Sequence, residues 1–197
     1  MWYWIFKAVF FIIFKLLFRL KTEGVENIPK KSNFIIVANH SSFLDPLIVM
    51  AVVPKKIHCI TLRFLYKISW IGWFLHAIEA LPIGWSSQKA LDLLTRNKNV
   101  GLFPEGGISR DGKLKRFRSG AILLAIKTGR PIVPCAIWGS FEALPVTAKF
   151  PKLLPVRLKI GKPIYLLKQF EDYVDDIYLQ EGILKLRNTI KEMIDAG

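Results

Sequence analysis

Short apolar runs alternate with longer amphipathic stretches along most of this chain, and this alternation limits its fold more than any other feature. Five runs of strand length cover residues 34–38, 57–62, 100–103, 132–138 and 156–160. Four stretches of helical character cover residues 64–80, 87–97, 120–128 and 177–193. Strands that alternate with helices form βαβ units, whose strands run parallel. The sequence therefore predicts an α/β fold with a largely parallel central sheet and helices on both faces.

Charge and composition narrow the choice of partner. The 197 residues carry a formal net charge of +14, so the partner is expected to be anionic. Hydrophobic residues make up 52% of the chain and aromatic residues 13%. This apolar content is high for a nucleic-acid-binding protein. A chain that is both basic and apolar is expected to bind an anionic membrane surface and no nucleic acid.

Residues 1–21 are expected to form an apolar helix that associates with the membrane, and residues 22–197 a separate domain. Large aromatic side chains near the N-terminus suit the headgroup layer of a bilayer. The longest uninterrupted apolar run, residues 8–14, is far shorter than the ~20 residues that a spanning helix needs. The residues that interrupt the stretch are Lys7, Lys15 and Arg19. We expect an interfacial helix and a peripheral or monotopic membrane protein on the cytoplasmic face; the alternative is a helix that covers the core.

Two short motifs about sixty residues apart follow two of the expected strands. One runs from Asn39 through His40 to Asp45, and the other is Phe103-Pro104-Glu105-Gly106. Open α/β sheets place their chemistry in the loops after strand ends. An imidazole is a natural general base near neutral pH, and a carboxylate on its other nitrogen orients the ring. The alternative is that Asp45 caps a helix that starts at Pro46.

Several other features are expected to have no catalytic role. Cys59 and Cys135 lie in apolar runs and are expected to be buried, unreactive thiols. His58 and His76 lack partners at the spacing of metal ligands, so no metal and no other cofactor is expected.

Two further patterns resemble active-site motifs but are incomplete. Residues 107–114 nearly match a phosphate-binding loop, but Leu114 replaces the hydroxyl residue that would reach Mg²⁺. Ser41 and Ser42 adjoin His40, yet the strained elbow of serine hydrolases is absent. A nucleotide site is therefore rejected, and a serine hydrolase ranks behind a general-base enzyme.

Taken together, the two motifs resemble the signature of the glycerolipid acyltransferase family, which includes the PlsC-type 1-acylglycerol-3-phosphate acyltransferases. The similarity extends to further blocks and covers roughly residues 27–164. These blocks are Gly72-Trp73, Leu81-Pro82-Ile83, the stretch from Ser109 to Gly112 with Phe117 and Gly120, and residues 131–134. Each block alone is common, whereas the combination is specific.

The resemblance implies a reaction in phospholipid biosynthesis. His40, oriented by Asp45, would deprotonate the hydroxyl of a membrane-bound, glycerol-based lysolipid. The oxygen would then attack the thioester of an acyl-carrier protein or acyl-CoA directly, with no acyl-enzyme. The motif around Glu105 and Gly106 would shape the acceptor site. Residues 22–197 would then be the acyltransferase domain.

Two positions depart from the family pattern. The family carries arginines for the acceptor phosphate where this chain has Ile108 and Trp85. Nearby cations could grip the phosphate instead, although such a cluster is commonly a solvated face. The cluster consists of Arg110, Lys113, Lys115, Arg116 and Arg118. Alternatively, the acceptor is a lysophospholipid or another lysolipid, or the protein is a catalytically inert lipid binder on this fold.

Overall fold

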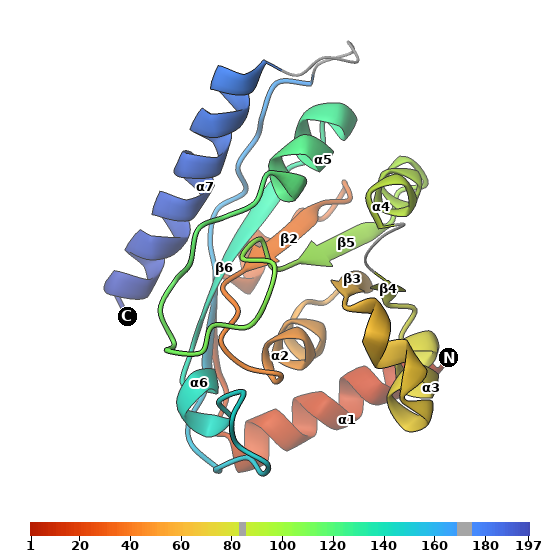
Figure 1. The fold of residues 1–197 in the computed structure, drawn as a ribbon, viewed down its shortest axis with the longest axis vertical. Coiled ribbons are helices and arrows are strands. Elements are labelled where there is room, and N and C mark those ends of the chain that lie inside the picture. Colours follow the sequence, from red (N-terminus) through yellow and green to blue (C-terminus); the bar gives the residue numbers. More distant parts are fainter. Residues whose placement is uncertain (83–85, 169–174) are drawn as a thin grey trace.

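A seven-stranded sheet forms the centre of the protein in the computed structural model, which describes residues 1–82, 86–168 and 175–197 (Figure 1). The strand order is β1-β7-β6-β2-β5-β3-β4. The strands are β1 (Lys21–Glu23), β2 (Ile35–Ala38), β3 (Ile57–Thr61), β4 (Leu81–Pro82), β5 (Asn99–Leu102), β6 (Ile132–Trp138) and β7 (Arg157–Ile160).

The sheet is largely parallel, as the alternation of strands and helices predicts. Five neighbouring strands run in one direction: β6, β2, β5, β3 and β4. Strand β7 pairs with β6 in the antiparallel direction. Strands β1 and β4 were not predicted. β1 is fully exposed and polar, and β4 is only two residues long, so neither has the apolar run that identifies a strand.

Helices cover both faces of the sheet, which confirms the predicted fold class (Figure 1). In β2, Ile36 and Ala38 belong to one core, which α1 and α2 cover, whereas Ile35 and Val37 belong to the other, which α4, α5 and α7 cover. The helices are α1 (Trp2–Leu17), α2 (Asp45–Val52), α3 (Ser69–Ala77), α4 (Ser86–Thr95), α5 (Gly120–Thr128), α6 (Ser140–Ala143) and α7 (Asp176–Asp195).

The prediction of one helix over residues 64–80 is wrong. The chain forms a 3₁₀ segment, η2 (Arg63–Lys67), and then α3, with an extended residue, Ile68, between them. The chain folds back at this point, so Gly72 of α3 lies against the backbone of Tyr66. A Cβ at Gly72 would lie 2.5 Å from the Tyr66 carbonyl oxygen, so only glycine allows this approach.

Two connections predicted without secondary structure contain short elements. The polar link over residues 21–33 contains β1 and the 3₁₀ segment η1 (Val25–Asn27). Between the expected strands over residues 132–138 and 156–160, the chain forms the short helix α6. These elements are too short for hydrophobic periodicity to reveal them.

Helix α1 has one face in the core and one face in solvent. Tyr3 and Phe14 are both 1% exposed, and the Tyr3 hydroxyl oxygen accepts from the backbone N–H of Ile57 at 2.9 Å. On the outer face, Ile12 is 55% exposed and Leu16 is 71% exposed. No helix among the described residues is both long enough and apolar enough to cross a bilayer.

Candidate active site

The two motifs meet at the carboxyl ends of β2 and β5, which are neighbours in the sheet. Val37 of β2 pairs with Leu102 of β5, and the chain leaves both strands within one residue of this pair. His40 lies two residues after the end of β2, and Phe103 follows β5 directly. Parallel neighbouring strands thus bring together residues that are more than sixty positions apart.

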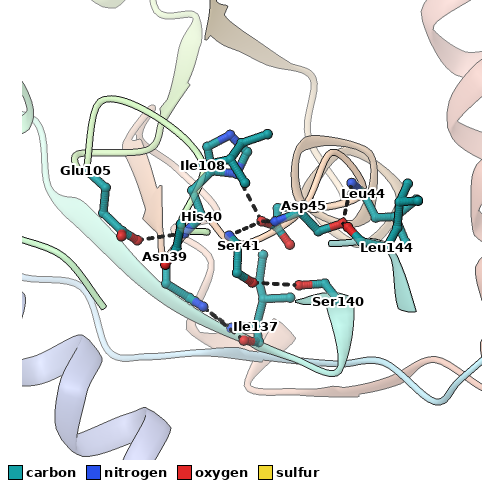
Figure 2. Close-up of polar contacts among 12 residues, drawn as sticks. Asn39, His40, Ser41, Leu44, Asp45, Glu105, Ile108, Ile137, Ser140 and Leu144 are labelled. Carbon is teal, nitrogen blue, oxygen red and sulfur yellow. Dashed lines mark hydrogen bonds and ion pairs between the residues drawn. The ribbon is translucent and has the colours of Figure 1, made fainter. Parts of the chain in front are cut away.

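His40 and Asp45 form a direct pair. The Nδ1 atom of His40 lies 2.9 Å from the Oδ2 atom of Asp45 (Figure 2). The His40 side chain is 14% exposed and that of Asp45 is fully buried. A carboxylate that accepts from Nδ1–H leaves Nε2 unprotonated in the neutral ring, with its lone pair available as a base.

Asp45 is not the helix cap that the alternative interpretation predicts. It is the first residue of α2, whose N-cap position is Leu44, and Pro46 follows in the first turn. The same Oδ2 atom accepts from the backbone N–H groups of Ser41 and Ser42, at 2.7 and 2.8 Å. The tight turn between His40 and Asp45 is therefore closed by the carboxylate itself.

The second carboxylate, Glu105, joins the two motif loops. Its Oε1 atom accepts from the backbone N–H of His40 at 2.7 Å, and its Oε2 atom accepts from that of Lys115 at 3.0 Å. Burial raises the pKa of the Glu105 carboxyl, while the N–H groups of Lys115 and His40 oppose that shift. Glu105 therefore fixes the backbone of His40 against the loop that follows β5.

The His40 ring is held from a third side by Phe103. The two rings stack with their centroids 4.2 Å apart and their planes 25° apart. The His40 carbonyl accepts from the N–H of Ser109 at 2.7 Å. The ring and the backbone of His40 therefore have fixed positions before any ligand binds, and Nε2 is the ring nitrogen left without a hydrogen bond to the described residues.

Gly106 turns the chain after Glu105. Its φ of +72° lies in the left-handed region, and a Cβ here would lie 2.3 Å from the Nε atom of Arg118. The Arg118 N–H donates to the Pro104 carbonyl at 2.8 Å. Arg118 is therefore the member of the basic cluster that packs against the motif.

The side chains of the remaining cations form no hydrogen bond or ion pair with the His40 ring in the described part of the chain. Their side chains are exposed, and Lys115 Nζ donates to the Ile108 carbonyl at 2.8 Å. The exposed members are Arg110, Lys113, Lys115 and Arg116. Ile108 is half-buried, and Trp85 lies outside the described residues.

Asn39 has a role that the motif alone did not reveal. Its side-chain amide donates to the Ile137 carbonyl at 3.0 Å and accepts from the Ile137 N–H at 2.8 Å, which ties the end of β2 to β6 (Figure 2). Ser41 Oγ lies 3.2 Å from Ser140 Oγ. In residues 1–82, 86–168 and 175–197, no three side chains of the metal-ligating types lie together.

Comparison with known proteins identifies the family to which this site belongs. A family model described as Acyltransferase matches residues 19–138, which is more than half of the chain. A 1-acyl-sn-glycerol-3-phosphate acyltransferase from Borreliella burgdorferi is 29% identical over 183 residues, covering 88% of this chain and 73% of the relative. The Bacillus subtilis protein of the same name is 33% identical over 154 residues, covering 74% of each.

A solved structure shares the fold. The crystal structure of PlsC, the 1-acyl-sn-glycerophosphate (LPA) acyltransferase of Thermotoga maritima, matches with a TM-score of 0.79 and 27% identity, over 97% of this chain and 79% of that one. These similarities confirm the resemblance inferred from the two motifs. The chain is an acyltransferase and belongs to the Acyltransferase family.

Proposed function

We propose that this enzyme transfers a fatty acyl group from a thioester to the hydroxyl of a glycerol-based lysolipid, with His40 as general base. The observation that carries the proposal is the 2.9 Å contact between His40 Nδ1 and Asp45 Oδ2, which leaves Nε2 free to accept a proton. The placement of this pair at the carboxyl edge of a parallel sheet supports the same role.

The proposed reaction needs no acyl-enzyme. Nε2 of His40 takes the proton of the acceptor hydroxyl as its oxygen attacks the thioester carbonyl, and the buried Asp45 carboxylate stabilises the imidazolium. The tetrahedral intermediate then collapses, its C–S bond breaks, and the thiolate leaves. The imidazolium returns its proton to that thiolate, so the products are an ester and a free thiol.

The proposed acceptor is 1-acylglycerol-3-phosphate, and the proposed donor is an acyl-carrier protein or acyl-CoA. The names of the bacterial relatives support this acceptor. Isoleucine at position 108 weighs against a phosphate clamp of the usual form, because its side chain cannot donate a hydrogen bond. A lysophospholipid is therefore the second acceptor to test.

The proposed site of action is the surface of an anionic membrane on the cytoplasmic face, with residues 1–21 as the associating segment. The apolar outer face of α1 supports this placement. Helix α3 extends this apolar face, because Trp73 of α3 contacts the rings of Trp2 and Phe6 of α1. Exposed tryptophans suit the headgroup layer, and Trp70 of α3 is 74% exposed.

One mass-spectrometric assay tests the proposed function. Acyl-carrier protein and CoA thioesters are each offered with lysophosphatidate and with a panel of lysophospholipids. Acylation of lysophosphatidate by either donor supports the proposal, and acylation of lysophospholipids alone corrects the acceptor. Turnover on no acceptor would favour the inert lipid-binding alternative.

A further inference from the structure

The loop between α6 and β7 presents apolar side chains to solvent. Residues 149–155 are all exposed, and their sequence is Lys-Phe-Pro-Lys-Leu-Leu-Pro. Phe150 is 81% exposed, Leu153 is 51% exposed and Leu154 is 38% exposed. Water solvates such side chains poorly, so three of them within seven residues indicate a surface that another molecule covers.

The backbone of this loop suits contact with lipid. The Lys152 N–H donates to the Ala143 carbonyl at 2.7 Å, and the Leu154 N–H donates to the Lys152 carbonyl at 2.8 Å. Pro151 and Pro155 have no N–H to donate. Burial of an unpaired backbone donor in an apolar layer is costly. A loop whose donors are paired or missing at these four positions therefore enters such a layer at lower cost.

The loop lies at the end of α1 that is farther from α3 (Figure 1). Directly after the loop, the Val156 N–H donates to the carbonyl of Phe18, the C-cap of α1, at 2.9 Å. At the other end of α1, the ring of Trp2 contacts Trp73 of α3. The 16 residues of α1 span roughly 24 Å. The loop and α3 therefore flank the proposed membrane-associating helix at its two ends.

The charge of the loop matches an anionic lipid surface. Lys149 and Lys152 border the apolar side chains, and no Asp or Glu occurs from residue 143 to residue 160. A lysine at the headgroup layer is attracted to anionic lipid while its apolar stem lies along the hydrophobic surface. A second copy of the chain would bring the same positive charge to a symmetric contact, so repulsion disfavours a dimer through this loop.

We propose that residues 149–155 insert into the headgroup layer of an anionic bilayer, as a third contact beside α1 and α3. The inference rests on the proposed membrane site of action and specifies which side of the active site faces lipid. Just before the loop, the Leu144 carbonyl accepts from the Ser42 hydroxyl at 2.8 Å, in the turn between the two catalytic residues. Phe43 of the same turn is 49% exposed. Insertion of the loop therefore holds the turn that carries His40 next to the bilayer that supplies the acceptor.

Vesicle binding by a loop variant tests the inference without turnover. Phe150→Ser/Leu153→Ser is compared with the control Tyr165→Ser/Leu167→Ser, whose side chains are 69% and 77% exposed. The control lies near the start of β6, whereas the loop follows its end. The loop variant is expected to bind phosphatidylglycerol vesicles about tenfold more weakly, and the control is expected to bind as the unsubstituted protein does. Equal binding by the loop variant would overturn the inference.

A fluorescent probe reports insertion directly. Cys59 and Cys135 are buried, so a thiol-reactive probe on the variant Phe150→Cys labels the loop. Its emission should shift to the blue on phosphatidylglycerol vesicles and be quenched by brominated lipid, whereas a probe on Leu167→Cys should show neither change. Unchanged emission from the loop probe would overturn the inference. So would a dimer that the loop variant abolishes while its vesicle binding is unchanged, because the loop would then bind a second copy.

Kinetics separate this inference from the proposed function. The loop variant should have a lowered kcat/KM for long-chain lysophosphatidate in vesicles and an unchanged kcat/KM for a short-chain lysophosphatidate that is monomeric in solution. A protein whose labelled loop enters the bilayer but which transfers no acyl group would refute the proposed function and leave the inference standing. An enzyme that acylates vesicle lipid while its loop remains in water would refute the inference alone.

Discussion

At the scale of single residues, the hydrogen bonds of Asp45 to the described residues all involve one of its two carboxylate oxygens. Its Oδ2 atom accepts from the Ser41 and Ser42 backbone N–H groups and contacts the His40 ring, while its Oδ1 atom is buried and has no partner in the described part of the chain. The charge of this carboxylate is therefore directed at one turn and one ring.

Asp45→Asn is expected to lower kcat/KM by about 10²-fold or more, because a neutral amide stabilises the imidazolium poorly. An asparagine whose oxygen replaces Oδ2 would keep the three contacts but would bury its amide donors in the unpartnered Oδ1 position. Acyl-transfer kinetics, with circular dichroism as the control for folding, measure this effect. Activity within threefold of the unsubstituted enzyme would contradict the orienting and electrostatic role.

Glu105→Gln is expected to change how stability depends on pH. Because the pKa of Glu105 is raised in the folded protein, the unfolded chain releases this proton at lower pH than the folded protein does. The carboxyl therefore contributes stability that is present at low pH and is lost as pH rises through the folded-state pKa. The difference in unfolding free energy between the unsubstituted protein and Glu105→Gln should fall over this range.

Urea titrations from pH 4 to pH 7 would test this dependence, with the exposed Glu26→Gln as the matched control. A difference that stays constant with pH, or that grows as pH rises, would contradict it.

At the scale of elements, α1 and α2 are joined by a lysine whose role the sequence did not reveal. Lys7 Nζ donates to the carbonyls of Met50, Ala51 and Val53 at 2.8, 2.8 and 2.6 Å, at the carboxyl end of α2. A cation here donates to carbonyls that lack helical partners and interacts favourably with the negative end of the helix dipole. Lys7 therefore supports the helix whose first residue is Asp45.

Lys7→Met is expected to reduce the free energy of unfolding by about 1–3 kcal/mol, because it leaves these carbonyls without their donor. Chemical denaturation measures the change. Lys15→Met on the same helix is the control, since the one hydrogen bond of Lys15 to the described residues is a long contact, 3.4 Å to the Leu20 carbonyl. Equal loss in both variants would show that Lys7 has no special role in the cap.

The predictable part of the fold consists of elements with a strong local pattern. Residues 120–128 and 132–138 form α5 and β6 with the predicted bounds, because their apolar residues and the Gly-Arg-Pro break between them are local signals. The break at Ile68 was not predictable, because it depends on Gly72 lying against the Tyr66 backbone. A close backbone approach of this kind leaves no periodic pattern in the sequence.

The same distinction holds at the candidate site. The motif spacing indicated that His40, Asp45 and Glu105 belong together, but it did not indicate that Glu105 accepts from the His40 backbone. That contact requires β2 and β5 to be neighbours in register.

At the scale of the whole molecule, apolar surface on α1 and α3 is expected to rest on lipid. The double variant Trp70→Ala/Leu16→Ala removes two side chains that are 74% and 71% exposed. It should bind anionic vesicles about tenfold or more weakly, because each side chain would no longer bury several tens of Å² of apolar surface in the bilayer. Co-sedimentation with phosphatidylglycerol vesicles measures this. Leu184→Ala on α7, on the opposite side of the sheet, is the control (Figure 1). Equal binding by all three proteins would show that this face does not bind the membrane.

The central claim is that one imidazole at the carboxyl edge of the sheet removes the acceptor proton. The most direct measurement is the acyl-transfer rate of His40→Ala with lysophosphatidate and acyl thioester, on protein whose circular dichroism and vesicle binding match those of the unsubstituted enzyme. The account predicts a loss on the order of 10²- to 10⁴-fold. A rate close to that of the unsubstituted enzyme would contradict it.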